Sequence, residues 1–166
     1  MCKLIRNFAG MMIQMLQIVP LMWRAVRPSK VVDMPAVVNT FWLRKGFEGL
    51  TFFGKILTPT QALADEFNTG FNALKNHEMI HLRQAQACGD SWVRFYLLYL
   101  WYWLRALPAN RQLRHGAYLL NPFEMEAYRH MNDLHYLDHC EEGAQEWRRY
   151  AQMPLKQRLR IYQKTQ

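Results

Sequence analysis

Apolar and polar residues follow one another along much of this chain with the spacing of α-helices. The pattern predicts one helix over residues 69–88, and Gly89 is well placed to end it because glycine readily takes the left-handed conformation that follows a helix. A second helix is predicted over 91–107, where most side chains are apolar or aromatic, and Pro108 would end it.

The apolar run inside the second predicted helix, residues 95–104, is too short to cross a membrane. Ten helical residues extend about 15 Å, half the thickness of the hydrocarbon core of a bilayer. We therefore expect a helix that is buried in the protein. Five of its residues are Tyr or Trp. These rings favour a position with one polar edge in water, so a shallow position at a membrane interface stays open as an alternative.

Toward the C-terminus, Asn121 followed by Pro122 is typical of a helix N-cap with proline in the first turn. A third helix is therefore predicted from this point to about His139. Residues 145–166 are basic and helix-prone, and Pro154 predicts a break within them.

Residues 36–58 have a different, β-type composition, with Gly46 between two runs rich in Val, Thr and aromatic residues. This arrangement predicts a hairpin or strand pair that ends before Pro59. The chain has 166 residues, enough for one domain with its own core, and shows no repeat or linker. We therefore predict a single α+β domain over residues 1–166, mostly helical with a small N-terminal β-sheet or hairpin.

Residues 1–26 allow two interpretations. Lys3 and Arg6 precede an apolar run, as in a signal peptide or a membrane anchor. Polar residues and Pro20 interrupt that run, no cleavage site of small residues follows it, and a membrane span needs about 20 apolar residues. We expect an amphipathic helix that packs on the domain, with a membrane-associated segment as the alternative.

The composition is globular, with 51% hydrophobic residues, and the net charge of +8 allows nucleic acid or an anionic membrane surface as a partner. The basic C-terminal stretch has no nucleic-acid recognition motif, so we rank nucleic acid low and keep the membrane surface open. The three cysteines form no Cys-x-x-Cys pair. They indicate a reducing, cytoplasmic setting rather than a disulfide framework.

The segment His77-Glu78-Met79-Ile80-His81 carries the most specific chemical signal. On a helix, residues four apart lie on the same face, so both imidazoles can bind one metal ion. Glu78 lies off that line but close enough to hold a metal-bound water, which makes it a candidate general base. Chance would produce this motif in about one chain in a hundred of this composition.

The helical wheel of residues 69–88 places this motif on the apolar side. The opposite, polar stripe should face solvent: Asn72, Lys75, Asn76, Met79, Arg83 and Gln86. Two histidines and a carboxylate on an apolar face need partners, because a buried charge is costly without one. A metal ion would satisfy them. The alternative is a hydrogen-bonded Glu–His cluster that only stabilises the core.

A catalytic zinc site needs a third protein ligand, and the run from Asn121 to Tyr128 contains two carboxylates, Glu124 and Glu126. On a helical wheel Glu124 shares a face with Tyr128, whereas Glu126 lies about 160° away on a side that looks solvated. We therefore favour Glu124 as the ligand. Its position also allows an alternative role, a capping box with Asn121.

His77-Glu-x-x-His81 followed by Glu124-x-x-Ala127 on a later helix resembles the gluzincin metallopeptidases, especially small single-domain members of that clan. The resemblance covers about residues 70–130. It implies a minimal gluzincin-like core, zinc held by His77, His81 and Glu124, Glu78 as the base, and a peptide or protein substrate.

The sequence departs from the gluzincin pattern at Tyr128, where an Asp that hydrogen-bonds a ligand histidine is usual. A catalytically inactive scaffold that keeps the fold and the zinc is therefore an alternative to a peptidase. Peptide hydrolysis also needs a donor for the oxyanion, and the candidates are His115, Tyr118, Tyr128 and His135. His135 and His139, also four residues apart, are a weaker candidate for a second metal site.

Overall fold

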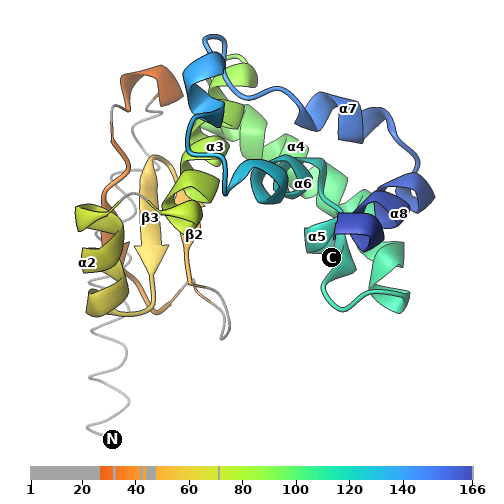
Figure 1. The fold of residues 1–166 in the computed structure, drawn as a ribbon, viewed down its shortest axis with the longest axis horizontal. Helices are drawn as coiled ribbons and strands as arrows, with labels where there is room; N and C mark the ends of the chain where they lie inside the picture. The colour runs from red at the N-terminus through yellow and green to blue at the C-terminus, as the bar shows by residue number, and fades with distance from the viewer. Residues whose placement is uncertain (1–26, 32, 42, 44–47, 71, 166) are drawn as a thin grey trace, which may run out of the picture.

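The structure is a computed structural model that describes residues 27–31, 33–41, 43, 48–70 and 72–165 (Figure 1). The helix predicted within residues 1–26 lies outside these residues. In chain order the elements are η1 (Pro28–Lys30), β1 (Ala36–Val38), β2 (Leu50–Phe52), β3 (Lys55–Thr58), α2 (Gln61–Thr69), α3 (Ala73–Ala87), α4 (Trp92–Ala106), η2 (Leu107–Arg111), α5 (Gly116–Leu119), α6 (Pro122–His130), η3 (Tyr136–His139), α7 (Trp147–Gln152) and α8 (Leu155–Thr165). The predicted α+β fold, mostly helical with a small sheet, is confirmed.

The sheet has three strands in the order β1-β3-β2, so β3 is central and β2 forms an edge. β1 runs parallel to β3 and β2 runs antiparallel to it. Gly46 lies outside the described residues, and the predicted hairpin between the runs on either side of it was wrong, because β1 and β2 do not pair with each other and each pairs with β3. The hairpin turns instead at Phe53 and Gly54, whose φ angles of 46° and 82° match the two-residue turn that fits the twist of paired strands.

α3 begins later than predicted. Asn72 caps its first turn by accepting a hydrogen bond from the backbone N–H of Lys75, and the preceding residues form the separate helix α2. Gly89, with φ of 79°, follows the end of α3 as expected. α4 begins after its N-cap Ser91 and ends at Ala106, close to the predicted bounds.

α6 starts at Pro122 as predicted but ends at His130, well before His139. The reason lies on α3. The side-chain amide of Asn76 is fully buried and donates to the carbonyls of His130, Met131 and Asp133 at 3.0–3.1 Å. These bonds satisfy the carbonyls at the end of α6. The prediction that Asn76 faces solvent was therefore wrong.

α3 lies between the sheet and the helices α4 and α6, as Figure 1 shows. The core fills this space with large apolar side chains from every layer: Met34, Ile56, Phe67, Leu82, Trp92, Phe95, Phe123 and Trp147. Burial of such residues supplies most of the driving force for folding. This packing holds α3 and α6 together, and these are the helices that carry the predicted ligands.

Toward the C-terminus, α7 and α8 are separated at Pro154, as the sequence predicts. No helix among the described residues combines the length and apolar character of a membrane span.

Candidate metal centre

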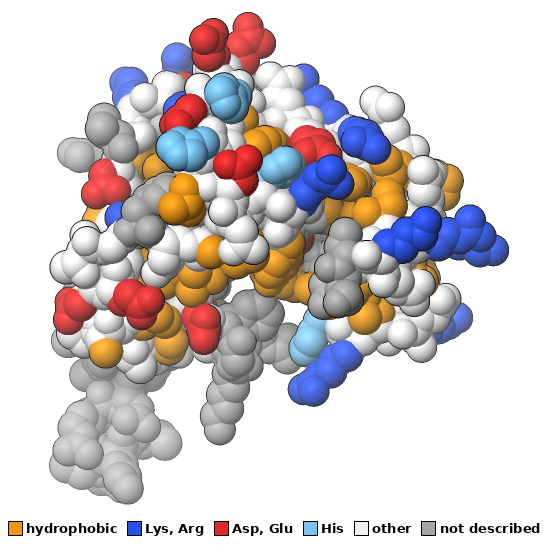
Figure 2. All heavy atoms as spheres, viewed as in Figure 1, with side chains coloured by type: hydrophobic (Ala, Val, Ile, Leu, Met, Phe, Trp, Pro, Cys, Tyr) orange, Lys and Arg blue, Asp and Glu red, His pale blue; other side chains and the backbone are white. Residues whose placement is uncertain are grey.

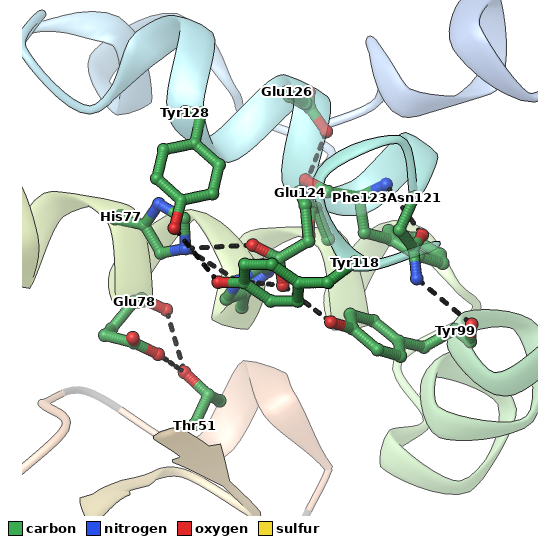
Figure 3. A network of polar contacts seen from close by, with 12 residues as sticks. Thr51, His77, Glu78, Tyr99, Tyr118, Asn121, Phe123, Glu124, Glu126 and Tyr128 are labelled. Carbon is green, nitrogen blue, oxygen red and sulfur yellow. Dashed lines mark hydrogen bonds and ion pairs between the residues drawn. The ribbon is translucent and has the colours of Figure 1, made fainter. Parts of the chain in front are cut away.

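Three of the predicted site residues meet in the core between α3 and α6 (Figure 3). The Nε2 atoms of His77 and His81 lie 3.2 Å apart. The Glu124 carboxylate lies 3.3 Å from His77 Nε2 and 3.4 Å from His81 Nε2. All three residues are buried. Within the part of the chain that the structure describes, this is the one group of three such side chains that could hold a metal ion.

These separations fit a tetrahedral metal site. Ligand atoms about 2.0–2.1 Å from a zinc ion, at the corners of a tetrahedron, lie about 3.3–3.4 Å from each other. The Nε2–Nε2 distance of 3.2 Å is close to that edge length, and the carboxylate meets the two rings with different oxygens, Oε2 at 3.3 Å from His77 and Oε1 at 3.4 Å from His81. Glu124 Oε2 is buried and makes no hydrogen bond, so it keeps its lone pairs for an ion. The donor set therefore fits zinc.

Glu124 is held in place from two sides. Glu124 is the third residue of α6. Asn121 caps this helix by accepting a hydrogen bond from the backbone N–H of Phe123. The N–H of Asn121 bonds to the carbonyl of Tyr118, so Glu124 does not close a capping box. Instead the Tyr99 hydroxyl, from α4, donates to Glu124 Oε1 at 2.7 Å. The carboxylate is thereby directed at the histidines.

His81 is oriented by a buried hydrogen-bonded relay. Its Nδ1 lies 2.8 Å from Gln84 Oε1, and the Gln84 amide donates to Glu126 Oε2 at 2.7 Å and to the Phe123 carbonyl at 2.9 Å. Because the amide nitrogen faces two acceptors, its oxygen faces the ring and accepts from Nδ1–H. This fixes the tautomer that leaves Nε2 free for a metal.

Glu126 anchors this relay, so its predicted solvation was wrong. The residue is fully buried, and its Oε1 accepts from the Tyr136 hydroxyl and from the N–H of Glu146, each at 2.7 Å. Its carboxylate is therefore committed to the support of His81 and is not a ligand. Together Gln84 and Glu126 supply the hydrogen bond that orients the His81 ring.

On its Nδ1 side, His77 is supported by packing rather than by a hydrogen bond. Tyr128 lies edge-on against its ring, with centroids 4.6 Å apart. His77 Nδ1 is buried and makes no hydrogen bond. The two histidines are thus held unequally: His81 has a polar support, and His77 has an aromatic one.

Glu78 is buried next to the triad but does not join it. Its Oε2 accepts a hydrogen bond from the Thr51 hydroxyl on the edge strand β2, which turns the carboxylate toward the sheet (Figure 3). Glu78, His77, His81 and Glu124 all line one small cavity of about 160 Å³. The candidate base therefore faces the same space as the candidate ligands.

Opposite charges in the triad shift its pKa values in opposite directions. Burial alone would lower the pKa of His81, but the charge of Glu124 and the hydrogen bonds to Glu124 and Gln84 raise it to about 9. Burial alone would raise the pKa of Glu124, but His81 and His77 hold it well below its usual range. An ionised carboxylate next to a protonated imidazole is a pair in which a metal cation can replace the proton.

A larger cavity of about 500 Å³ opens next to this site and shares His77 and Glu78 with it. Tyr118, Tyr128 and His115 line this cavity, so three of the four candidate oxyanion donors lie near the triad. The Tyr118 and Tyr128 hydroxyls are 3.2 Å apart. Burial, followed by the charge of Glu124, raises the pKa of Tyr118, which keeps its hydroxyl proton available for donation.

The remaining candidates lie elsewhere. His135 is exposed and pairs with Asp138 on the surface at 3.0 Å. It does not line either cavity next to the triad. His135 and His139 also form no part of a three-residue metal group within the described residues.

The sequence did not reveal the supporting roles of four residues, one of which, Glu126, was considered only as a ligand: Thr51, Gln84, Tyr99 and Glu126. Gln84 had a usable signal, because it lies three residues after His81, one turn along the same face. Thr51 and Tyr99 come from β2 and α4, and only the tertiary packing brings them to the motif.

Comparison of the chain with protein families, curated proteins and solved structures finds no match. The interpretation of the site therefore depends on its geometry and on the residues that form it.

Proposed function

We propose that this protein is a zinc-dependent peptidase, with the metal held by His77, His81 and Glu124. The observation that supports this most is the buried convergence of three ligand side chains, with the two imidazole Nε2 atoms 3.2 Å apart and the Glu124 carboxylate 3.3–3.4 Å from them. Two imidazoles and one carboxylate are a ligand set typical of catalytic zinc in peptidases, because three protein ligands leave the fourth position for water.

Zinc bound at such a site lowers the pKa of its water toward about 7 and polarises a scissile carbonyl. Glu78 would act as the general base, accepting a proton from the attacking water and passing it to the leaving amine. The Thr51 hydroxyl holds this carboxylate beside the cavity that it lines together with the three ligands.

Tyr118 is the best-placed donor for the oxyanion of the tetrahedral intermediate. It lines both cavities, and in the smaller one it lies with His77, His81 and Glu124. Tyr128, whose hydroxyl is 3.2 Å from that of Tyr118, could support its orientation. Hydrogen bonds aimed at the developing negative charge would add to the stabilisation that the metal provides.

The size of the cavities points to a peptide or a dedicated protein partner rather than to broad digestion. The cavities measure about 160 and 500 Å³, and the edge strand β2 runs past the smaller one through Leu50 and Thr51. An extended peptide could pair with such an edge, as peptides do with other exposed strands.

The test is a peptide-library digest followed by mass spectrometry, with the zinc-loaded protein and two variants. Glu78→Gln should keep zinc and lose at least about 100-fold in cleavage rate, because general base catalysis contributes about that much. Glu142→Gln is the matched control: Glu142 is an exposed carboxylate that lines neither cavity next to the triad, and its substitution should leave the rate unchanged. Equal rates for wild type and Glu78→Gln would exclude this mechanism.

A zinc-binding scaffold without catalysis is the second candidate. The observation that favours it is the buried Nδ1 of His77, which lacks the hydrogen bond that usually orients a ligand histidine. A protein that binds zinc at full stoichiometry but cleaves no peptide in the library would be this scaffold.

A further inference from the structure

α4 carries an apolar outer face that no described part of the chain covers. Its inner face packs into the core through Trp92, Phe95 and Tyr99. The outer face presents large apolar side chains that are 37–64% exposed: Val93, Leu97, Leu100, Trp101, Leu104 and, just beyond the helix, Leu107. In Figure 1 this helix lies behind α6. We call these six residues the α4 stripe.

The α4 stripe is continuous. Val93, Leu97, Leu100 and Leu104 are spaced by four, three and four residues, so they form one line along the helix. The fifteen residues of α4 extend about 22 Å. A helix that is apolar on both faces is normally buried, and an exposed apolar patch of this extent indicates a binding surface.

Basic side chains border the stripe. Arg94 and Arg105 are exposed along one edge of α4, and the Arg105 guanidinium lies 5.6 Å from the centre of the Trp101 ring. The chain has no Asp or Glu from Ser91 to Phe123, while Arg111 and Arg114 are exposed within that range.

Helix α8 adds basic residues near the end of α4. Leu155, Lys156 and Leu159 line a shallow cavity together with Pro108 and Ala109 of η2, so α8 begins beside the end of α4. α8 exposes further cations, Lys156, Arg160 and Lys164, and no acid follows Glu146. Figure 2 shows Lys and Arg gathered on the side where α8 lies and Asp and Glu mainly around α2 and at the top of the view.

We propose that the α4 stripe and its basic border bind the surface of an anionic lipid bilayer, with α4 lying in the plane of the membrane. Leucines and valine on a helix face enter the boundary between headgroups and acyl chains, and tryptophan favours the same depth. The arginines and lysines would contact anionic headgroups, where each basic side chain raises affinity about five-fold.

The charges distinguish this occupant from a second copy of the chain. A symmetric contact through the α4 stripe would bring the Arg94 and Arg105 side chains of both copies to one interface. No acidic residue of α4 or η2 could pair with them, so the contact would be repulsive. Anionic headgroups complement the same border.

The test is co-sedimentation of the full chain with vesicles of phosphatidylcholine alone and of phosphatidylcholine with 30% phosphatidylserine, in about 50 mM salt. We expect binding to the anionic vesicles that weakens as salt rises. Leu97→Gln with Leu104→Gln should reduce it about ten-fold or more, since both side chains would leave the acyl boundary. Arg94→Gln with Arg105→Gln should reduce it about 25-fold on the anionic vesicles and little on the neutral ones.

Leu134→Gln is the matched control, because Leu134 is a similarly exposed leucine, 43% accessible, outside the α4 stripe. It should bind as wild type does. Zinc content and thermal midpoint, measured on every variant, report whether the fold and the metal centre are intact, so this proposal can fail independently of the proposed function.

Three results would overturn the proposal. The wild type could stay in the supernatant with anionic vesicles at low salt. Its binding could survive loss of both leucines, which would assign the contact to another part of the chain. The wild type could instead be a dimer that the Leu97 and Leu104 substitutions convert into a monomer, with neither the dimer nor the monomer binding vesicles. That result would make the α4 stripe a subunit interface.

Discussion

Gln84 offers the sharpest perturbation of the metal centre, because it supports a ligand without being one. Gln84→Leu removes the acceptor for His81 Nδ1–H and the donor to both Glu126 Oε2 and the Phe123 carbonyl. Each buried polar group that loses its partner costs about 1–3 kcal/mol. Glu126 still accepts hydrogen bonds from the Tyr136 hydroxyl and the Glu146 N–H. The loss of its bond to Gln84 should therefore cost less stability than a complete loss of partners would.

From these three lost bonds we expect the metal-free variant to be destabilised by about 3–5 kcal/mol. Zinc affinity should fall about 10–100-fold, because His81 loses the bond that fixes its tautomer and ring orientation. Competition with a fluorescent zinc chelator measures the affinity, and urea unfolding in the presence of a strong chelator measures the stability.

The control is Gln86→Leu, a substitution at a half-buried glutamine of the same helix that does not contact the triad. Glu126→Gln is a milder second variant, because it keeps the shape of the anchor and one acceptor. Its effect on zinc affinity should be smaller than that of Gln84→Leu. A folded Gln84→Leu protein with wild-type zinc affinity would refute the relay.

Three further predictions concern single groups. In the metal-free protein, the pKa of His81 is about 9 in the folded state and about 6.5 in the unfolded state. The stability that protonated His81 contributes is therefore complete below pH 6.5 and is lost as the pH rises to about 9. Urea unfolding of the metal-free protein should therefore show a loss of a few kcal/mol of stability over that pH window. If the His81→Gln variant lost the same amount over the same window, His81 would not be the cause. Tyr99→Phe removes the donor to Glu124 Oε1, and we expect zinc affinity to fall about 3–10-fold in the chelator assay; unchanged affinity would exclude a positioning role for Tyr99. Asn76→Ala leaves three carbonyls near the end of α6 without their donor and should destabilise the protein by about 2–4 kcal/mol, whereas a thermal midpoint equal to that of wild type would show that water replaces the amide.

The parts of the site that share one helix could be predicted from the sequence. The spacing of His77 and His81 places both rings on one face of α3, and the wheel separates Glu124 from Glu126 on α6. The structure brings His77, His81 and Glu124 together. Helical periodicity is a local property, so it can be used without knowledge of how the helices pack.

What the sequence missed depends on tertiary contacts. A polar residue such as Asn76 or Glu126 looks solvated on a wheel, but each is buried because a neighbouring element supplies its partners. The hairpin was misplaced for a related reason. The β2–β3 hairpin turns at Phe53, whose positive φ is rare for a bulky residue, so residue preferences do not point to this turn.

The metal content of the purified protein tests most directly whether His77, His81 and Glu124 form a zinc site. Elemental analysis of the metal-replete protein should find about one zinc per chain, and His81→Ala and Glu124→Ala should each lose it while Glu78→Gln keeps it. Wild-type protein that contains no zinc under these conditions would contradict the claim and would make the triad a hydrogen-bonded cluster of the core.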